Sequence, residues 1–516
     1  MTGFVDVLLR ALILAAQATA VGGVVFALWV LRPPPARDVE LTRVWGLVAL
    51  GAVVLAVAQT LSAVTQLVAL EGNAHVVDLL NTSYVRVSAA RVATALALFG
   101  AAWALRRHAS TGRRTGVIAA AMVLAALAPW TSHAAARVAG RGPLLALDAI
   151  HQVAAWIWVG GLAHLVVIAA RRGAGGWPPA LLRRFSALAL TSVSALVVAG
   201  GTLSFLYIDG VGALLGTAYG VMVLTKVALL AVLLALGACN FFAVRRVPRA
   251  GDPAPLRLRR FVEVELGVGL TVLAVAASLT SLPPAVDVVA DRATFAEVGT
   301  RFVPRWPTFS SPALSELPID DRNAPRTDAD RQWSEYNHHW SGLFVLAMGA
   351  LALLHQTGRA SWARHWPLIF LGLAVFLFWR SDPGAWPIGP SGFWESNLYP
   401  EVLQHRIFLL LVVIFGIFEW AVRTRHLTSP ACALVFPLLC AVGGGLLLTH
   451  SHASLNLKSE FLVEVTHAPL GVFGIAVGWG RWLQLRLTPA EDSAPARVWA
   501  AGLVAVGLLL VFYRES

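Results

Sequence analysis

The sequence is short of charge for its length. Only 13% of its 516 residues are Asp, Glu, Lys or Arg, about half the fraction typical of a soluble domain. Hydrophobic residues make up 57% of the chain, and its mean hydropathy is +0.70. Too little polar sequence remains to cover that much apolar surface in water. The composition excludes a soluble globular protein and predicts an all-α polytopic helical membrane protein.

Apolar stretches long enough to cross a bilayer follow one another along the chain. A spanning helix needs about 20 apolar residues, and we count about 14 such stretches. The first has no basic segment before Phe4, and its apolar run extends past Trp29 to three consecutive prolines. That run is too long for the core of a signal peptide. We therefore expect it to remain as the first transmembrane helix.

Lysine is nearly absent, occurring only at positions 226 and 458, so the net charge of +12 comes from arginine. The arginines are not gathered into one patch, which argues against nucleic-acid binding. They recur instead in alternate loops, as at Arg106, Arg107, Arg113 and Arg114. The short loops between are neutral or acidic. This is the positive-inside pattern, and it predicts cytoplasmic arginine-rich loops with both termini outside.

One connection is long, from Leu282 to about Asn337, and it is rich in Pro, Asp, Ser and Arg. Counting the predicted spans places it on the outer side of the membrane. It divides the chain into an eight-helix domain (1–281), an outer loop (282–337) and a six-helix domain (338–516).

Cysteine and methionine are also scarce, with three and four residues. The cysteines fall within predicted helices or at their ends, so no disulfide framework is implied. The sequence has no Cys-x-x-Cys-His motif, which excludes covalently attached haem. Histidine is better represented, with 14 residues, and most fall on the predicted outer side. Imidazole and carboxylate ligands suit Cu(II) or Zn better than a thiolate-lined Cu(I) path.

Two histidine groups share one pattern. Asp148-x-x-His151 begins one predicted helix, and Glu464-x-x-His467 begins another. A carboxylate three residues before a histidine lies on the same helical face, where it can orient the imidazole or share a ligand set. The preceding helices end in further histidines: His133 in the first case, and His450 and His452 in the second.

The two groups lie 316 residues apart (151 to 467), and the helices before them match as well. Tyr84 and Arg91 in one correspond to Tyr399 and Arg406 in the other. Predicted helices 3 to 5 therefore form a parallel internal repeat of helices 11 to 13. An offset of eight spans preserves orientation, as expected for halves related by an axis along the membrane normal.

Two further clusters place a carboxylate and a histidine on one helical face. These are Glu335-x-x-His338-His339 and Glu401-x-x-x-His405. Ionisable groups at this depth are costly unless they are paired or functional. Metal binding and structural pairing both remain open interpretations for each cluster.

Lys226 lies within a predicted span, which makes it a functional candidate. It could also extend to the outer surface or pair with Asp209. Lys226, Met348 and Cys440 are the possible pathway residues, and no catalytic residue is singled out. We therefore expect a protein that is not an enzyme.

At this point the sequence resembles the bacterial copper-resistance protein D family (CopD/PcoD), in a longer form with a C-terminal membrane extension. The resemblance is carried by Ser132-His133-Ala134, by 148–161 (Asp-Ala-Ile-His-Gln-Val-Ala-Ala-Trp-Ile-Trp-Val-Gly-Gly), by Arg184-Phe185-Ser186, and by 215–220 (Leu-Gly-Thr-Ala-Tyr-Gly) followed by Lys226. It covers predicted helices 4 to 8.

The resemblance implies a bacterial inner-membrane protein that handles copper ion arriving from the periplasm, with a small CopC-like copper-binding protein as partner. In the family this is described as copper uptake. Two other functions stay open. Histidines on neighbouring helices could bind haem b, or the protein could be a non-transporting receptor for a periplasmic copper chaperone.

Overall fold

The computed structural model describes residues 2–32, 39–70, 78, 80–108, 110–172, 177–246, 256–319, 327–449 and 458–515. Within these ranges the regular secondary structure is entirely helical. The all-α prediction is therefore confirmed.

Thirteen helical segments of the described chain are long and apolar enough to cross a membrane. The fourteenth expected span is α14 (Asp328–Gln356), which has 29 residues. It is less apolar because its first half carries Glu335, His338 and His339, and it is not among the thirteen. The polytopic architecture is as predicted, and α14 accounts for the difference in count.

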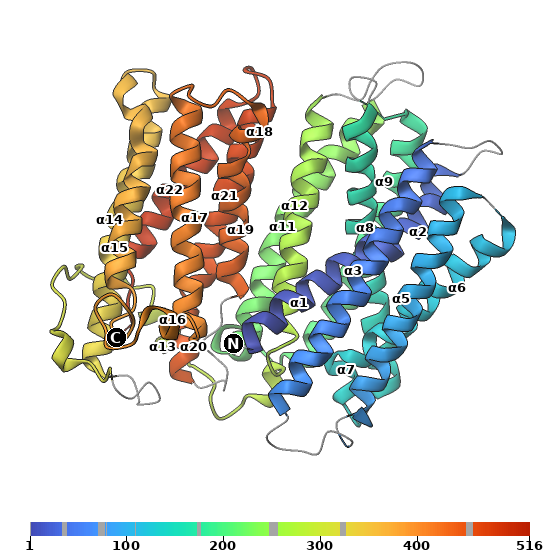
Figure 1. Cartoon of the computed structure of the whole chain (residues 1–516), viewed down its shortest axis with the longest axis horizontal. Coiled ribbons are helices and arrows are strands. Elements are labelled where there is room, and N and C mark those ends of the chain that lie inside the picture. Colours follow the sequence, from blue (N-terminus) through green and yellow to red (C-terminus); the bar gives the residue numbers. More distant parts are fainter. Residues whose placement is uncertain are drawn as a thin grey trace. The chain divides into compact units, whose positions relative to one another are not determined.

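The helices divide into two compact units, which we describe separately (Figure 1). The N-terminal unit comprises Thr2–Leu214 and Met222–Val289. The C-terminal unit is formed mainly by Leu215–Val221 and Ala290–Ser516.

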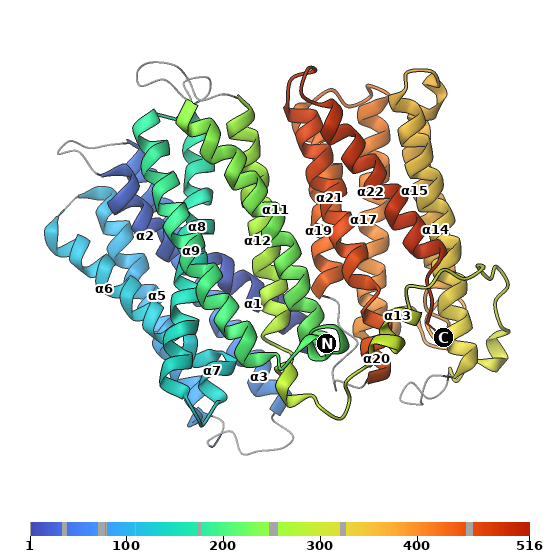
Figure 2. The ribbon, with the colours of Figure 1, turned by 180° about the vertical axis from the view of Figure 1, so that it is seen from behind.

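In the N-terminal unit, α3 packs against both α1 and α5, while α8 packs against α9 and α12 (Figure 2). The connections between the long helices are short and carry arginine or other polar residues. Helices that follow one another in the sequence therefore mostly pack against one another. The long helices after the first span are α3 (Val39–Leu70), α5 (Ser83–Arg107), α6 (Thr111–Leu127), α8 (Arg141–Arg172), α9 (Pro179–Tyr207), α11 (Ala218–Arg246) and α12 (Leu256–Leu279), with short α7 (His133–Ala136) and α10 (Val211–Gly216).

The first span is not a uniform α-helix. It runs as α1 (Thr2–Gln17), a π-helical segment η1 (Ala18–Gly22), α2 (Gly23–Val25) and a second π-helical segment η2 (Phe26–Leu31). At η1 the chain approaches α8 closely: a Cβ on Gly22 would lie 2.1 Å from the Trp156 carbonyl oxygen. Only glycine fits there. Close by, His164 Nε2 lies 2.9 Å from the Thr19 carbonyl, which joins η1 to α8.

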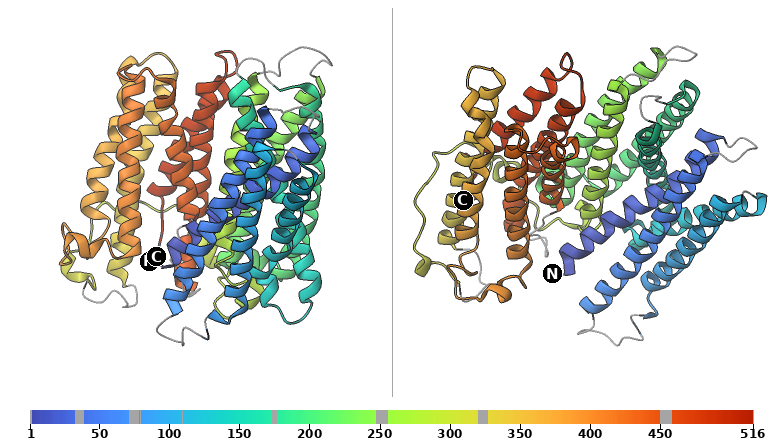
Figure 3. Two further views of the ribbon diagram at one scale, coloured as in Figure 1. Left: turned by 45° about the vertical axis from the view of Figure 1, so that its right-hand side comes forward. Right: turned by 45° about the horizontal axis from the view of Figure 1, so that its top comes forward.

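In the C-terminal unit, α14 packs against α22 and α19 packs against α21 (Figure 3). Its core is aromatic, with Trp366, Phe370, Phe436 and Trp499 buried together. The helices of this unit are α13 (Phe295–Thr300), α14, η7 (Ser361–Leu368), α15 (Ile369–Arg380), α16 (Phe393–Ser396), α17 (Pro400–Arg423), α18 (Pro430–Ala433), α19 (Val435–Thr449), α20 (Lys458–Glu464), α21 (His467–Arg486) and α22 (Ser493–Val511).

Candidate functional site

Polar side chains of α8 and α11 meet around Asp148 in the N-terminal unit. Gln152 Nε2 donates to Asp148 Oδ2 at 2.8 Å. Asp148 also interacts electrostatically with Lys226 of α11 and with His133 of α7, and it lies within hydrogen-bonding reach of Ser132. The structure thus brings together three residues that the sequence singled out separately. Lys226 serves as a counter-charge to Asp148.

The two histidines near Asp148 are each held by a main-chain carbonyl of another helix. His151 Nδ1 lies 3.2 Å from the Leu196 carbonyl of α9, and His133 Nε2 lies 3.4 Å from the Leu279 carbonyl of α12. Burial lowers the pKa of His133 below its usual value, although the Leu279 carbonyl and Asp148 oppose the shift. His133 is therefore neutral at neutral pH, the form that can ligate a metal.

In the C-terminal unit, His338 of α14 and His467 of α21 meet beside Tyr513. The two imidazole centroids are 5.9 Å apart, and the Tyr513 ring stacks on His338 at 3.8 Å. His338 Nδ1 lies 2.8 Å from the Ser334 carbonyl, and His467 Nδ1 lies 3.0 Å from the Val463 carbonyl. Because a carbonyl only accepts, each Nδ1 carries the hydrogen and each Nε2 carries the lone pair. This tautomer ligates metals through Nε2.

The neighbours of His338 are engaged by the chain itself. His339 Nε2 donates to the Tyr513 carbonyl at 2.9 Å, while its Nδ1 accepts from the Thr308 amide at 3.0 Å. Glu335 Oε1 accepts from the Glu515 amide at 2.9 Å. In this arrangement His339 and Glu335 fasten Thr308, Tyr513 and Glu515 to α14.

His405 of α17 pairs with a carboxylate that the sequence analysis did not choose. Its Nδ1 lies 2.8 Å from Asp382 Oδ1, and Glu401 contributes electrostatically from one turn away. Burial raises the pKa of Asp382, but the facing His405 imidazole, the Ser381 hydroxyl and Arg406 outweigh it, so the pKa is lowered overall. The sequence did point to Asp382 as a candidate, because it lies in an acidic loop next to a predicted outer helix end.

The remaining predicted residues fall into three groups. His450 and His452 lie outside the described residues. Glu464, three residues before His467, is half-buried at the end of α20. Met348 is fully buried in the aromatic core, and Cys440 packs against that core.

No group of three or more His, Cys, Asp or Glu side chains within the described ranges is arranged to hold a metal ion. Two imidazoles do come together in the C-terminal unit, those of His338 and His467. The repeat that equates His151 with His467 stays a prediction, since His151 Nδ1 contacts a neighbouring helix and His467 Nδ1 contacts the carbonyl of Val463, four residues before it.

Two buried carboxylates were missed by the sequence analysis. The first is Glu265 of α12, only 5% exposed. Its Oε1 accepts from the Trp158 indole at 3.0 Å, and its Oε2 accepts from Asn240 Nδ2 at 2.8 Å. The available signal was an acidic residue well inside an apolar span, which marks a functional candidate by default.

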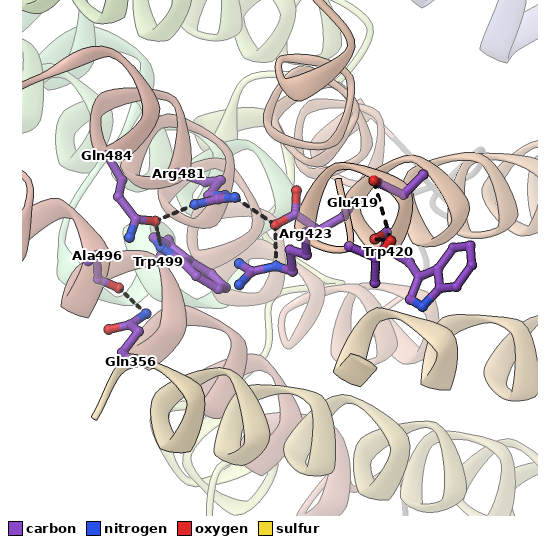
Figure 4. A network of polar contacts seen from close by, with 10 residues as sticks. Gln356, Glu419, Trp420, Arg423, Arg481, Gln484, Ala496 and Trp499 are labelled. Carbon is purple, nitrogen blue, oxygen red and sulfur yellow. Dashed lines mark hydrogen bonds and ion pairs between the residues drawn. The ribbon is translucent and has the colours of Figure 1, made fainter. Parts of the chain in front are cut away.

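The second buried carboxylate is Glu419 of α17, which has no exposed surface (Figure 4). Its Oε1 lies 2.6 Å from Arg423 Nε and 2.9 Å from Arg481 Nη2. Arg481 also donates to Gln484 Oε1 at 2.7 Å, and this oxygen accepts from the Trp499 indole at 2.7 Å. The three charged groups join α17 to α21 and sum to one positive charge.

Comparison with known proteins bears on part of the chain. Residues 179–279 match the family model described as copper resistance protein D. This segment of the chain is similar to copper resistance protein D. The predicted resemblance is thereby confirmed for α9, α11 and α12, which include Lys226, Asn240 and Glu265. The Asp148 segment precedes the matched residues.

Part of the chain is also similar to a curated protein. The chain is 35% identical over 159 residues to the copper transport protein CutJ of Bacillus subtilis (strain 168). The alignment covers 30% of this chain and 28% of CutJ, so the chain matches less than a third of that relative's length. No solved structure matches the chain.

Proposed function

We propose that this protein handles copper in the bacterial inner membrane, receiving the ion at the periplasmic face and moving it across. Its similarity to copper resistance protein D and to a protein named for copper transport supports copper as the cargo. Both matches carry names of transport or resistance proteins, which favours a non-enzymatic role. The observation that carries the proposal is the pair His338 and His467, each with Nδ1 held by a carbonyl.

The geometry of this pair suits a single copper ion. With a metal–nitrogen distance of about 2 Å, two imidazoles on one ion have centroids up to about 6.5 Å apart. The His338 and His467 centroids are 5.9 Å apart. The carbonyls of Ser334 and Val463 bind the Nδ1–H groups and so orient the rings, as hydrogen-bond partners of metal-ligating histidines usually do.

The Asp148 cluster is the matching candidate in the N-terminal unit. His133 and His151 supply imidazoles, and Asp148 supplies a negative charge that Lys226 balances. A cation entering this cluster would displace Lys226 as the partner of Asp148. Because its side chains are not arranged as a metal-holding group, the cluster is proposed as a place that the ion passes and not as a binding site.

The proposed setting follows from the charge pattern. Arginine-rich loops face the cytoplasm, both termini face the periplasm, and 282–337 is a periplasmic loop between domains 1–281 and 338–516. A CopC-like copper-binding protein is the proposed donor. Moving copper into the cell is the proposed direction.

Copper titration of the purified full-length protein tests the site. We expect His338→Ala and His467→Ala each to weaken copper binding by at least about 10-fold, because a ligand is lost outright. His426→Ala is the matched control, since His426 is exposed and stacks on Trp420. Unchanged affinity in both variants would place the copper ligands elsewhere.

Two further measurements separate copper transport from haem binding and from a receptor function. A strong Soret band that does not depend on copper, in a spectrum recorded from about 350 to 600 nm, would replace the copper proposal with a b-type haem protein. Copper uptake by vesicles containing the protein distinguishes a transporter from a receptor: binding without uptake would contradict translocation and leave copper reception standing.

A further inference from the structure

The N-terminal unit contains a carboxylate buried among neutral partners. Glu265 is contacted by Trp158 from α8 and by Asn240 from α11, and these two side chains are themselves 4% and 8% exposed. Each carboxylate oxygen therefore has one hydrogen-bond donor, and both donors are uncharged.

No cation balances Glu265 in the described part of the chain. Its electrostatic partners are Asn240 and Trp158 alone. On α12 itself, Arg259 and Arg260 lie close by, but both face Glu263. On α8 the nearest ionisable groups are His151 and His164, which contact the carbonyls of Leu196 and Thr19. On α11 the nearest described cation is Arg245, which is exposed and lies over the Phe241 ring.

An ionised carboxylate in this position would be costly, since two neutral hydrogen bonds do not replace the hydration of a buried charge. The neutral, protonated acid avoids that cost. Its added hydrogen also needs an acceptor. Asn240 Oδ1 is buried and has no hydrogen-bond partner, so this oxygen is available as the acceptor.

We propose that Glu265, with Asn240 and Trp158, is an intramembrane proton-binding site whose release of a proton is linked to copper movement. The link rests on the proposed copper transport; the proton site itself does not. The ligand is one proton exchanged with water, taken up as Glu265 becomes neutral and given back as it ionises. Acidic groups inside spans commonly serve as proton relays.

The site lies well away from the Asp148 cluster within the same unit. Along α8, Trp158 follows Asp148 by ten residues, which is about 15 Å of helix. Along α11, Leu229 and Leu233 are buried between Lys226 and Asn240. Apolar side chains therefore separate the two polar sites, so the proton and the cation do not compete for the same groups. Both sites are built on α8 and α11, and a movement of these helices would couple them.

Infrared difference spectroscopy of the full-length protein in lipid nanodiscs tests the proton site directly. We expect a carbonyl band from a protonated carboxylic acid at neutral pH, lost in Glu265→Gln and shifted in Trp158→Phe, which removes one hydrogen bond. Glu263→Gln is the matched control and should keep the band, because Glu263 is ion-paired with Arg259 and Arg260. A band that persists in Glu265→Gln overturns the proposal, as does one that responds to Na⁺ and not to pH.

Vesicle copper uptake measured against pH tests the link. A flux that needs one group deprotonated rises by up to about 10-fold per pH unit below that group's pKa. The wild type should show this rise, and Glu265→Gln should not. If both proteins show the same pH dependence, the coupling is wrong. If neither moves copper, the transport proposal fails, and the infrared result still decides whether Glu265 binds a proton.

Discussion

Glu265 in the N-terminal unit and Glu419 in the C-terminal unit are the same residue type, both buried within apolar helices, yet their surroundings are opposite. Glu265 meets an indole and an amide, whereas Glu419 meets two guanidinium groups. Burial alone therefore does not define the role of an intramembrane acid. The charge of its partners does.

The surroundings of Glu419 show how a permanent charge is kept within a helical bundle. Arg423 lies over the rings of Trp366 and Trp499, at 5.1 and 5.4 Å from their centroids, and Arg481 lies 5.6 Å from that of Trp499. Aromatic faces attract cations, and more so when water is excluded. The network is thus a fixed structural joint between α17 and α21, whereas Glu265 is suited to change its charge.

The largest expected effect comes from removing the carboxylate that has charged partners. Glu419→Gln leaves Arg423 and Arg481 buried without an anion, and losing one partner of a buried pair costs about 3–5 kcal/mol. Glu265→Gln removes no ion pair and should cost less than about 1.5 kcal/mol. Denaturant unfolding of both variants in mixed micelles measures the contrast. Equal losses would erase the distinction between the two acids.

A second experiment sharpens the comparison by removing the whole network. Glu419→Leu combined with Arg423→Met and Arg481→Met leaves no buried charge to compensate, so much of the stability lost in Glu419→Gln should return. Recovery should remain incomplete by about 1–2 kcal/mol, because the contacts of the arginines with Trp366 and Trp499 are also lost. The same unfolding assay applies. A triple variant less stable than Glu419→Gln would contradict this account.

The smallest effect is expected at Asp382, where solvent reaches the pair. The pKa of Asp382 is lowered in the folded protein, so its contribution is present above the unfolded value of about 3.9 and is lost as pH falls through the folded value. Because the His405 side chain is 40% exposed, Asp382→Asn should cost at most about 1 kcal/mol at neutral pH. Unfolding at a series of pH values checks this: the difference from wild type should vanish in acid, and a difference that grows there would refute the sign.

Much of the fold is readable from the sequence because hydrophobic length is a local property. Each span is encoded by about 20 consecutive apolar residues, and the helices of the structure coincide with those stretches. α14 is the instructive exception, because Glu335, His338 and His339 dilute its apolar pattern. Glu335 and His339 are accommodated there because Glu515 and Thr308 supply their hydrogen-bond partners.

The candidate site was less readable because its contacts are not local. His339 bonds to the Tyr513 carbonyl across 174 residues of sequence, and no spacing rule links two such positions. Searching for histidine with a nearby carboxylate found His338, His405 and Asp148. It overlooked Glu265 and Glu419, whose partners are tryptophan, asparagine and arginine on other helices.

The π-helical segment η1 (Ala18–Gly22) affects which way the residues before it face. A π-helical turn takes up about one extra residue relative to an α-helix, so the residues on either side keep their facing. Deleting one residue within η1 would let the span close into a regular α-helix, and Asp6 would still face Ser62, to which it is hydrogen-bonded at 2.9 Å. The same deletion within α1 would instead turn everything before it by about 100° and swing Asp6 away. A change of length is therefore absorbed at η1 and is not absorbed within α1.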